Sequence, residues 1–252
     1  MFLLKKIHPE QPLKELRWFD IGIVTLIMFG QFIVRSTQMY LASLSPSLST
    51  AVSETATNTA SEGAAYSSNF TLQIILLALA IIYLWIRHFD FKQLPIRLKW
   101  SVLFWVPFIF AIMGLFADMV STLSGQYNYF SPQVLAFISP MAVIDKFVAL
   151  SPMAIAYGLL NGFYEEFFFL GLLTSVKDKY KWLVLLFSTI IRVSFHTYQG
   201  ILWALVIGVA FGLLYYFLYK YKVKNLLPFF LVHALADMFG SSLIYLLVNW
   251  NY

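Results

Sequence analysis

Long stretches of apolar residues with almost no charge constrain the fold of this chain more than any other feature of its sequence. Each runs for about 17 residues or more, which is long enough for a helix to cross a bilayer. They lie near residues 19–42, 71–87, 101–123, 148–176, 182–199, 201–219 and 226–248. Of the 252 residues, 60% are hydrophobic and 12% are charged, and a soluble core of this size cannot bury that much apolar surface. The sequence therefore predicts an all-α fold, a polytopic membrane helix bundle of about seven (seven to eight) transmembrane helices.

Basic residues are concentrated in alternate connections between these stretches. They cluster before residue 18 and in the loops after the second, fourth and sixth stretches, whereas the other loops contain few besides Lys146. Because lysine and arginine are enriched in cytoplasmic loops, this pattern predicts a cytoplasmic N-terminus and an external C-terminus. The formal net charge of +5 then reflects membrane topology. We expect membrane lipids, and no nucleic acid, among the partners.

The predicted helices and loops divide the chain into three segments. Residues 1–18 are expected to form a cytoplasmic N-terminal segment. Residues 19–147 would form N-terminal transmembrane helices with a Ser/Thr-rich external loop at 43–69. Residues 148–252 would form a catalytic-type transmembrane core. The first stretch of this core is long and contains Pro152, so we expect it to begin with an interfacial or re-entrant piece.

Several classes of intramembrane protease have no support in the sequence. The chain contains no cysteine, which excludes disulfides and thiolate chemistry. It also contains no His-Glu-x-x-His zinc motif, no Gly-x-Gly-Asp motif and no Gly-x-Ser-x-Gly motif. Arg35 and Asp118 lie toward the external ends of their helices, where we expect their side chains to snorkel to the surface. The ionisable residues that remain deep within apolar stretches are Glu165, Glu166, Arg192, His196, His233 and Asp237.

These deep ionisable groups come from three helices and lie at similar depths. A charged side chain at the centre of a bilayer costs about 2.5 to 3.5 kcal/mol or more, so two adjacent glutamates there need a function or a partner. Counted from the nearest basic loops, Glu165, His196 and His233 lie roughly 18, 22 and 13 Å above the cytoplasmic ends of their helices. Polar residues with unrelated roles would not need to lie at the same depth in the membrane. The agreement therefore favours one shared polar cavity.

Three motifs in the second half of the chain resemble those of a known family. The first is Glu165-Glu166 within FYEEFFFLGLL, the second is His196 within VSFHTYQG, and the third is His233-Ala-Leu-Ala-Asp237. Together they resemble the CPBP family of intramembrane endopeptidases, which includes the Rce1-like CAAX prenyl proteases and the Abi-type bacteriocin-processing and immunity proteins. The resemblance extends over about residues 150–245, more than a third of the chain, and implies glutamate-dependent hydrolysis of peptides within the membrane.

Two positions depart from the family pattern. The arginine that usually ends the first motif is Leu170 here, and the phenylalanine that usually opens the second motif is Arg192. Adjacent side chains on a helix point about 100° apart, so Glu165 and Glu166 cannot serve the same role. We therefore hypothesise that Arg192 is a supporting residue that supplies the relocated cation and pairs with Glu166. Arg192 and His196 are four residues apart and share one helix face.

The resemblance also implies a role for each motif residue. Glu165, assisted by His196, would activate a water molecule for attack on the peptide bond. His233 would stabilise the oxyanion. Asp237, on the same helix face, would orient His233, because an ionised aspartate cannot donate a hydrogen bond. Asn161 is assigned a supporting role. We expect no cofactor, and a metal ion, if bound, would use at most Glu165, His196 and His233.

The expected function is therefore hydrolysis of small or membrane-associated peptides, with a peptide or a prenylated or hydrophobic protein tail as substrate. The alternative is a non-catalytic family member that acts by protein–protein interaction, in bacteriocin immunity or on a membrane partner such as a sensor kinase. A transporter with a carboxylate–histidine proton relay is a third class. An inverted repeat would favour a transporter, and the hydropathy shows none. The resemblance implies a multi-pass protein of a bacterial plasma membrane.

Overall fold

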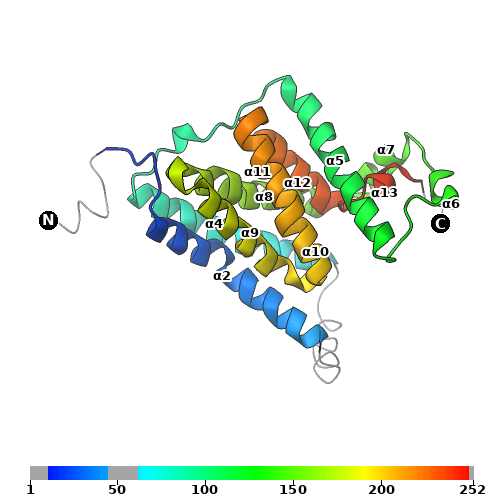
Figure 1. Cartoon of the computed structure of the whole chain (residues 1–252), viewed down its shortest axis with the longest axis horizontal. Helices are drawn as coiled ribbons and strands as arrows, with labels where there is room; N and C mark the ends of the chain where they lie inside the picture. The colour runs from blue at the N-terminus through cyan, green and yellow to red at the C-terminus, as the bar shows by residue number, and fades with distance from the viewer. Residues whose placement is uncertain (1–10, 45–61, 250–252) are drawn as a thin grey trace. The chain divides into compact units, whose positions relative to one another are not determined.

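The computed structural model describes residues 11–44 and 62–249, and these residues fold almost entirely into helices (Figure 1). The predicted all-α fold class is confirmed. Stretches of π-helix continue three of the helices, at Phe167–Leu172 after α8, Val206–Phe211 after α10 and Tyr219–Val223 after α11. The α-helices are α2 (Trp18–Ser43), α4 (Glu62–Ile86), α5 (Ser101–Leu123), α6 (Pro132–Leu135), α7 (Ala142–Ala149), α8 (Pro152–Glu166), α9 (Lys181–His196), α10 (Ile201–Leu205), α11 (Gly212–Leu218), α12 (Leu227–Phe239) and α13 (Leu243–Leu247).

Four helices in the described ranges are long and apolar enough to cross a membrane. They are α2, the part of α4 from Ala65 to Ile86, α5, and the continuous stretch Ile201–Val223. A fifth crossing results if α7 and Pro152–Ser175 form one broken span across a bend of 100°. Two further predicted stretches form shorter helices, α9 with 16 residues and α12 with 13. The chain is a multi-pass membrane protein, but the predicted number of about seven to eight crossings is not confirmed.

Backbone breaks inside apolar stretches explain the lower number. The predicted stretch 226–248 is interrupted at Gly240, whose φ is +77°, and α13 begins only at Leu243. The predicted stretch 148–176 bends immediately before Pro152, which lacks a backbone N–H and begins α8. This bend agrees with the interfacial or re-entrant start expected there. Hydropathy measures apolar length and does not report where the backbone turns.

The segment predicted as an external loop is described only in part. Residues 45–61 lie outside the described ranges. α4 begins at Glu62, so residues 62–69 are helical, which corrects the prediction of a loop over 43–69. The alanines in this segment are strong helix formers, and they extend the apolar helix toward its N-terminus. The cytoplasmic position of the N-terminus stays a prediction.

Contacts between residues divide the chain into two units. Unit 1 comprises Met1–Ile96 and Tyr164–Leu226, and unit 2 comprises Arg97–Phe163 and Leu227–Tyr252. The chain passes from unit 2 to unit 1 within α8. The predicted core segment 148–252 therefore contributes to both units.

Unit 1 is held together by close packing and by buried ion pairs, one of which lies near the start of α2. Near the start of α2, the buried carboxylate of Asp20 accepts hydrogen bonds from Arg87 Nε at 2.6 Å and from the Tyr83 hydroxyl at 2.7 Å. Gly208 allows the stretch Ile201–Val223 to approach α9, because a Cβ at this glycine would lie 2.7 Å from the backbone nitrogen of Val193. These contacts hold α2 to α4 and bring α9 close to the stretch that follows it.

Unit 2 contains a close helix crossing between α8 and α12. A Cβ at Gly162 would lie 2.4 Å from the carbonyl oxygen of Phe230, and one at Gly158 would lie 3.2 Å from that of Ala234. Two small residues four positions apart allow membrane helices to pack backbone against backbone. The crossing fixes the face of α12 that α8 contacts.

Asp118 on α5 corrects an expectation from the sequence. Its side chain is fully buried and does not snorkel to the surface. It accepts a hydrogen bond from the Ser242 hydroxyl and another from the Ile244 N–H at 2.9 Å. The carboxylate thus binds the first turn of α13, where backbone N–H groups lack partners within the helix. Arg35, in contrast, is exposed as expected.

Candidate active site

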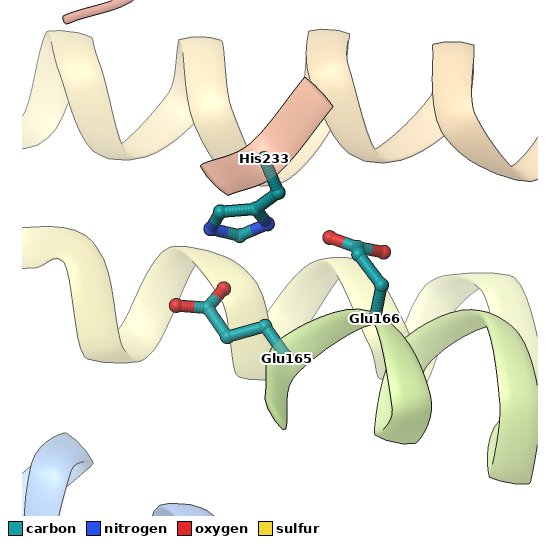
Figure 2. A group of neighbouring side chains, drawn as sticks. All are labelled: Glu165, Glu166 and His233. Carbon is teal, nitrogen blue, oxygen red and sulfur yellow. The ribbon is translucent and has the colours of Figure 1, made fainter. Parts of the chain in front are cut away.

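Glu165 and Glu166 are the last two residues of α8, and both are buried in unit 1. Their exposed fractions are 4% and 0%. A π-helix begins at the next residue, Phe167, and π segments within α-helices occur frequently at functional sites because they change the register of the side chains. Figure 2 shows the two carboxylates leaving their helix in different directions. The side chains leave the helix in different directions, as expected, but an oxygen of one carboxylate still lies within 4.8 Å of an oxygen of the other.

Arg192 on α9 is the cationic partner of Glu166. Its Nη2 lies 2.6 Å from Glu166 Oε2, and both side chains are almost wholly buried. The guanidinium also lies over the ring of Phe169, with Cζ 3.9 Å from the ring centroid. Gly212 leaves room for the side chain, since a Cβ there would lie 3.3 Å from Arg192 Cδ. The predicted pairing of Arg192 with Glu166 is confirmed.

His196 is the last residue of α9, and its ring orientation is set by a hydrogen bond to the backbone. Nδ1 lies 2.8 Å from the carbonyl oxygen of Arg192. A carbonyl oxygen can only accept, so Nδ1 carries a proton and Nε2 of the neutral ring is an acceptor. The ring of Phe195 lies 4.1 Å away, centroid to centroid. Arg192 therefore connects two motif residues, Glu166 through its side chain and His196 through its backbone.

In unit 2, α12 carries His233 and Asp237 on one face. Nε2 of His233 lies 3.9 Å from Asp237 Oδ1, within the range of an ion pair but longer than a hydrogen bond. The other carboxylate oxygen, Asp237 Oδ2, accepts a hydrogen bond from Asn161 Nδ2 on α8 at 2.9 Å. Asn161 is therefore a structural partner of Asp237, and its supporting role in the reaction stays a prediction.

The predicted site residues thus fall into two groups. Unit 1 contains Glu165, Glu166, Arg192 and His196, and unit 2 contains Asn161, His233 and Asp237. Among the predicted metal ligands, Glu165 and His196 belong to unit 1 and His233, which is also drawn in Figure 2, belongs to unit 2. Glu166 Oε2 already contacts a guanidinium, whose positive charge disfavours a divalent cation on the same carboxylate.

Some contributions to the site were missed by reasoning from the sequence. The close crossing of α8 and α12 at Gly158 and Gly162 supports Asn161 and Asp237, and its signal was available as a Gly-x-x-x-Gly spacing directly before the glutamates. The hydroxyl of Tyr164 donates to the carbonyl oxygen of Met28 on α2 at 2.5 Å. No local pattern marks that contact, because the two residues are far apart in the chain.

Comparison with known proteins gives one match. Residues 147–239 match the family model described as type II CAAX prenyl endopeptidase Rce1-like. This segment contains all three motifs, from Glu165 to Asp237. No curated protein and no solved structure shows a significant match to the chain.

Proposed function

Residues 147–239 belong to the Rce1-like family of type II CAAX prenyl endopeptidases, and from this membership we propose that the chain is an intramembrane endopeptidase. Its substrates are small or membrane-associated peptides, including prenylated or hydrophobic protein tails. A glutamate and a histidine activate the water that hydrolyses the peptide bond. The observation that carries the proposal is the unequal environment of the two adjacent glutamates.

Because the environments of the two carboxylates differ, we assign the two glutamates different roles. Glu166 is bound to Arg192 across 2.6 Å in a buried pair, so its charge is compensated and its carboxylate is held in place. Glu165 is buried as well, and its side chain leaves the helix in another direction (Figure 2), although one of its carboxylate oxygens lies within 4.8 Å of an oxygen of Glu166. We therefore assign general-base chemistry to Glu165 and a structural role to Glu166.

The tautomer of His196 supports its part in proton transfer. With Nδ1 donating to the Arg192 carbonyl, Nε2 of the neutral ring is an acceptor. In the proposed step, the water oxygen bonds to the peptide carbonyl carbon while its proton passes to Glu165, with His196 Nε2 orienting the water. The C–N bond then breaks, and the proton passes to the leaving amine. The products are a carboxylic acid and an amine.

His233 is proposed to stabilise the oxyanion of the tetrahedral intermediate. An ionised aspartate has no proton to donate, so Asp237 would orient His233 and would not contact the oxyanion. The hydrogen bond from Asn161 supports this assignment, because it holds the Asp237 carboxylate beside the His233 ring. Asn161 would then influence the reaction only through Asp237.

The test uses the full chain in lipid nanodiscs with two fluorogenic substrates, a farnesylated CAAX peptide and an unprenylated hydrophobic peptide. Glu165→Gln and His196→Ala should each lower kcat by about 100-fold or more, as loss of a general base does. His88→Asn serves as the matched control. His88 lies outside the motifs with φ of +54°, a conformation that asparagine tolerates, so this variant should retain activity. A Glu165→Gln variant that cleaves the substrates at the wild-type rate would refute the mechanism.

The variants Glu165→Gln and His196→Ala also test the non-catalytic alternative. The replacement of the family's arginine by Leu170, which is 2% exposed, is the observation that keeps this alternative open. A family member that acts only by binding a membrane partner would keep its biological activity in both Glu165→Gln and His196→Ala. A protease would lose it in both.

A further inference from the structure

Helix α2 lies outside the segment that matches the family, yet it contacts two of the motif segments in unit 1. The Tyr164 hydroxyl donates to the carbonyl oxygen of Met28, and Tyr164 directly precedes the glutamate pair. Farther along α2, the Ser36 hydroxyl oxygen accepts a hydrogen bond from the Tyr198 N–H at 2.9 Å. The same hydroxyl lies 2.9 Å from Thr197 Oγ1. Tyr198 and Thr197 follow His196 in the chain.

An aromatic contact lies between these two polar contacts. Phe29, which is 1% exposed, packs against Tyr164 on α8 and Phe195 on α9, with ring centroids 5.6 and 5.0 Å away. It also contacts Phe168 and Phe169 at 4.9 and 5.1 Å. Phe195 in turn packs on the His196 ring. One face of α2 therefore touches the immediate neighbours of the glutamate pair and of His196.

Ser36 is a buried polar residue near the C-terminal end of α2. Its exposed fraction is 3%, whereas Arg35 and Thr37 on either side are exposed. Tyr198 lies in the 3-10 turn Thr197–Gln199 that follows α9, and a backbone N–H inside a bilayer needs an acceptor within the protein. Ser36 supplies an acceptor for the Tyr198 N–H, where α9 ends and the chain turns. The contact therefore constrains the backbone directly after His196.

We propose that α2 is the template that sets the separation between the glutamate segment and the histidine segment of unit 1. Met28 and Ser36 are eight residues apart on one helix, about 12 Å along its axis. Tyr164 is anchored at one of these points and the segment after His196 at the other. Ser36 and Tyr164 are thus positioning residues that act through Glu165 and His196 and do not touch the substrate. This inference rests on the proposed function for its kinetic consequence.

The experiment compares Ser36→Ala and Tyr164→Phe with matched controls on α2, in the full chain in nanodiscs. Thr25→Ala removes a buried hydroxyl that bonds only within its own helix, to the Ile21 carbonyl at 2.7 Å. Tyr40→Phe controls for loss of a tyrosine hydroxyl. Ser36→Ala and Tyr164→Phe should each lower kcat about tenfold with KM within about twofold, because misplacement by a fraction of an ångström weakens a catalytic constellation. The controls should keep wild-type kcat.

A second readout separates this inference from the proposed function. The ring nitrogens of selectively labelled His196 have ¹⁵N chemical shifts that report its tautomer and hydrogen bond, whether or not the chain cleaves peptides. Ser36→Ala should change these shifts and Thr25→Ala should leave them as in the wild type. The template role would be overturned if the His196 shifts in Ser36→Ala were the same as those in Thr25→Ala and in the wild type. A wild type without peptidase activity would instead refute the proposed function, and the His196 shifts would still decide the role of Ser36.

Discussion

Arg192 on α9 and Glu166 at the end of α8 form a buried ion pair, with 2.6 Å between Nη2 and Oε2. The family's first motif usually carries its own arginine, and here that position is Leu170 within the π segment. The cation has moved to a neighbouring helix, where it replaces the phenylalanine of the second motif. The ion pair is the one that the two departures from the family pattern predict.

Loss of Arg192 should destabilise the protein strongly. Arg192→Met would leave the Glu166 carboxylate buried without its cation, which costs about 3–5 kcal/mol. Unfolding in detergent, followed by circular dichroism, measures the change. Lys220→Met, which removes the partner of Asp178 in an ion pair at the surface, should leave the melting temperature nearly unchanged.

The double variant Glu166→Gln with Arg192→Met provides a stricter check. Removing both charges of a buried pair is often neutral, so the double variant should be more stable than Arg192→Met alone. Additive destabilisation by the two substitutions would show that the pair does not act as a unit.

Gly162→Ala should destabilise the crossing of α8 and α12. The added methyl would lie 2.4 Å from the Phe230 carbonyl oxygen, and because backbone atoms cannot move aside easily, overpacking of this kind costs about 1–3 kcal/mol. Gly22→Ala on α2 is the matched control, since nothing lies within 4 Å of its added Cβ. The control should be neutral or more stable by up to about 1 kcal/mol. Equal stability of both variants would contradict the close crossing.

Asp118→Ala should destabilise the attachment of α13 to α5. The Ile244 N–H would lose its acceptor, and an unsatisfied buried donor costs about 1–3 kcal/mol. Hydrogen exchange at Ile244 would accelerate most. Asp145→Ala removes an exposed carboxylate and should change stability by less than about 0.5 kcal/mol. A slow exchange rate at Ile244 in Asp118→Ala would rule out this capping role.

The ion pair between Lys220 and Asp178, a residue that lies outside the candidate membrane spans, should depend on pH. The hydrogen bond from Lys220, at 2.8 Å, lowers the pKa of Asp178 below its ordinary value of 3.8. Its contribution to stability is therefore present above the ordinary pKa and is lost as the pH falls through the lowered pKa. A carboxyl ¹³C titration should give a lower pKa for Asp178 in the wild type than in Lys220→Met. Identical titration curves would show that the pair is absent in solution.

Chelators should not abolish peptidase activity. Arg192 already compensates the charge of Glu166, and its positive charge opposes a divalent cation beside the same carboxylate. Cleavage rates before and after dialysis against EDTA provide the measurement. Loss of activity that returns with added zinc would favour the alternative ligand set of Glu165, His196 and His233.

The pairing of Arg192 with Glu166 could be predicted from the sequence for a physical reason. A carboxylate in the membrane interior needs a cation, and the motif comparison leaves one candidate position. The burial of Asp118 could not be predicted, because its partners on α13 lie far away in the chain and no periodic pattern links them. The same holds for Ser36, whose hydroxyl looks like an ordinary polar residue in an apolar helix.

By itself, the sequence determined that the chain forms apolar helices and that a few ionisable residues are buried among them. Both properties depend on local hydropathy and on spacing along one helix. Only the tertiary structure decided that Asp118 is buried against α13, that Asn161 holds Asp237, and that the last apolar stretch breaks at Gly240. These outcomes depend on distances between helices and on the path of the backbone, which no local pattern of residues specifies.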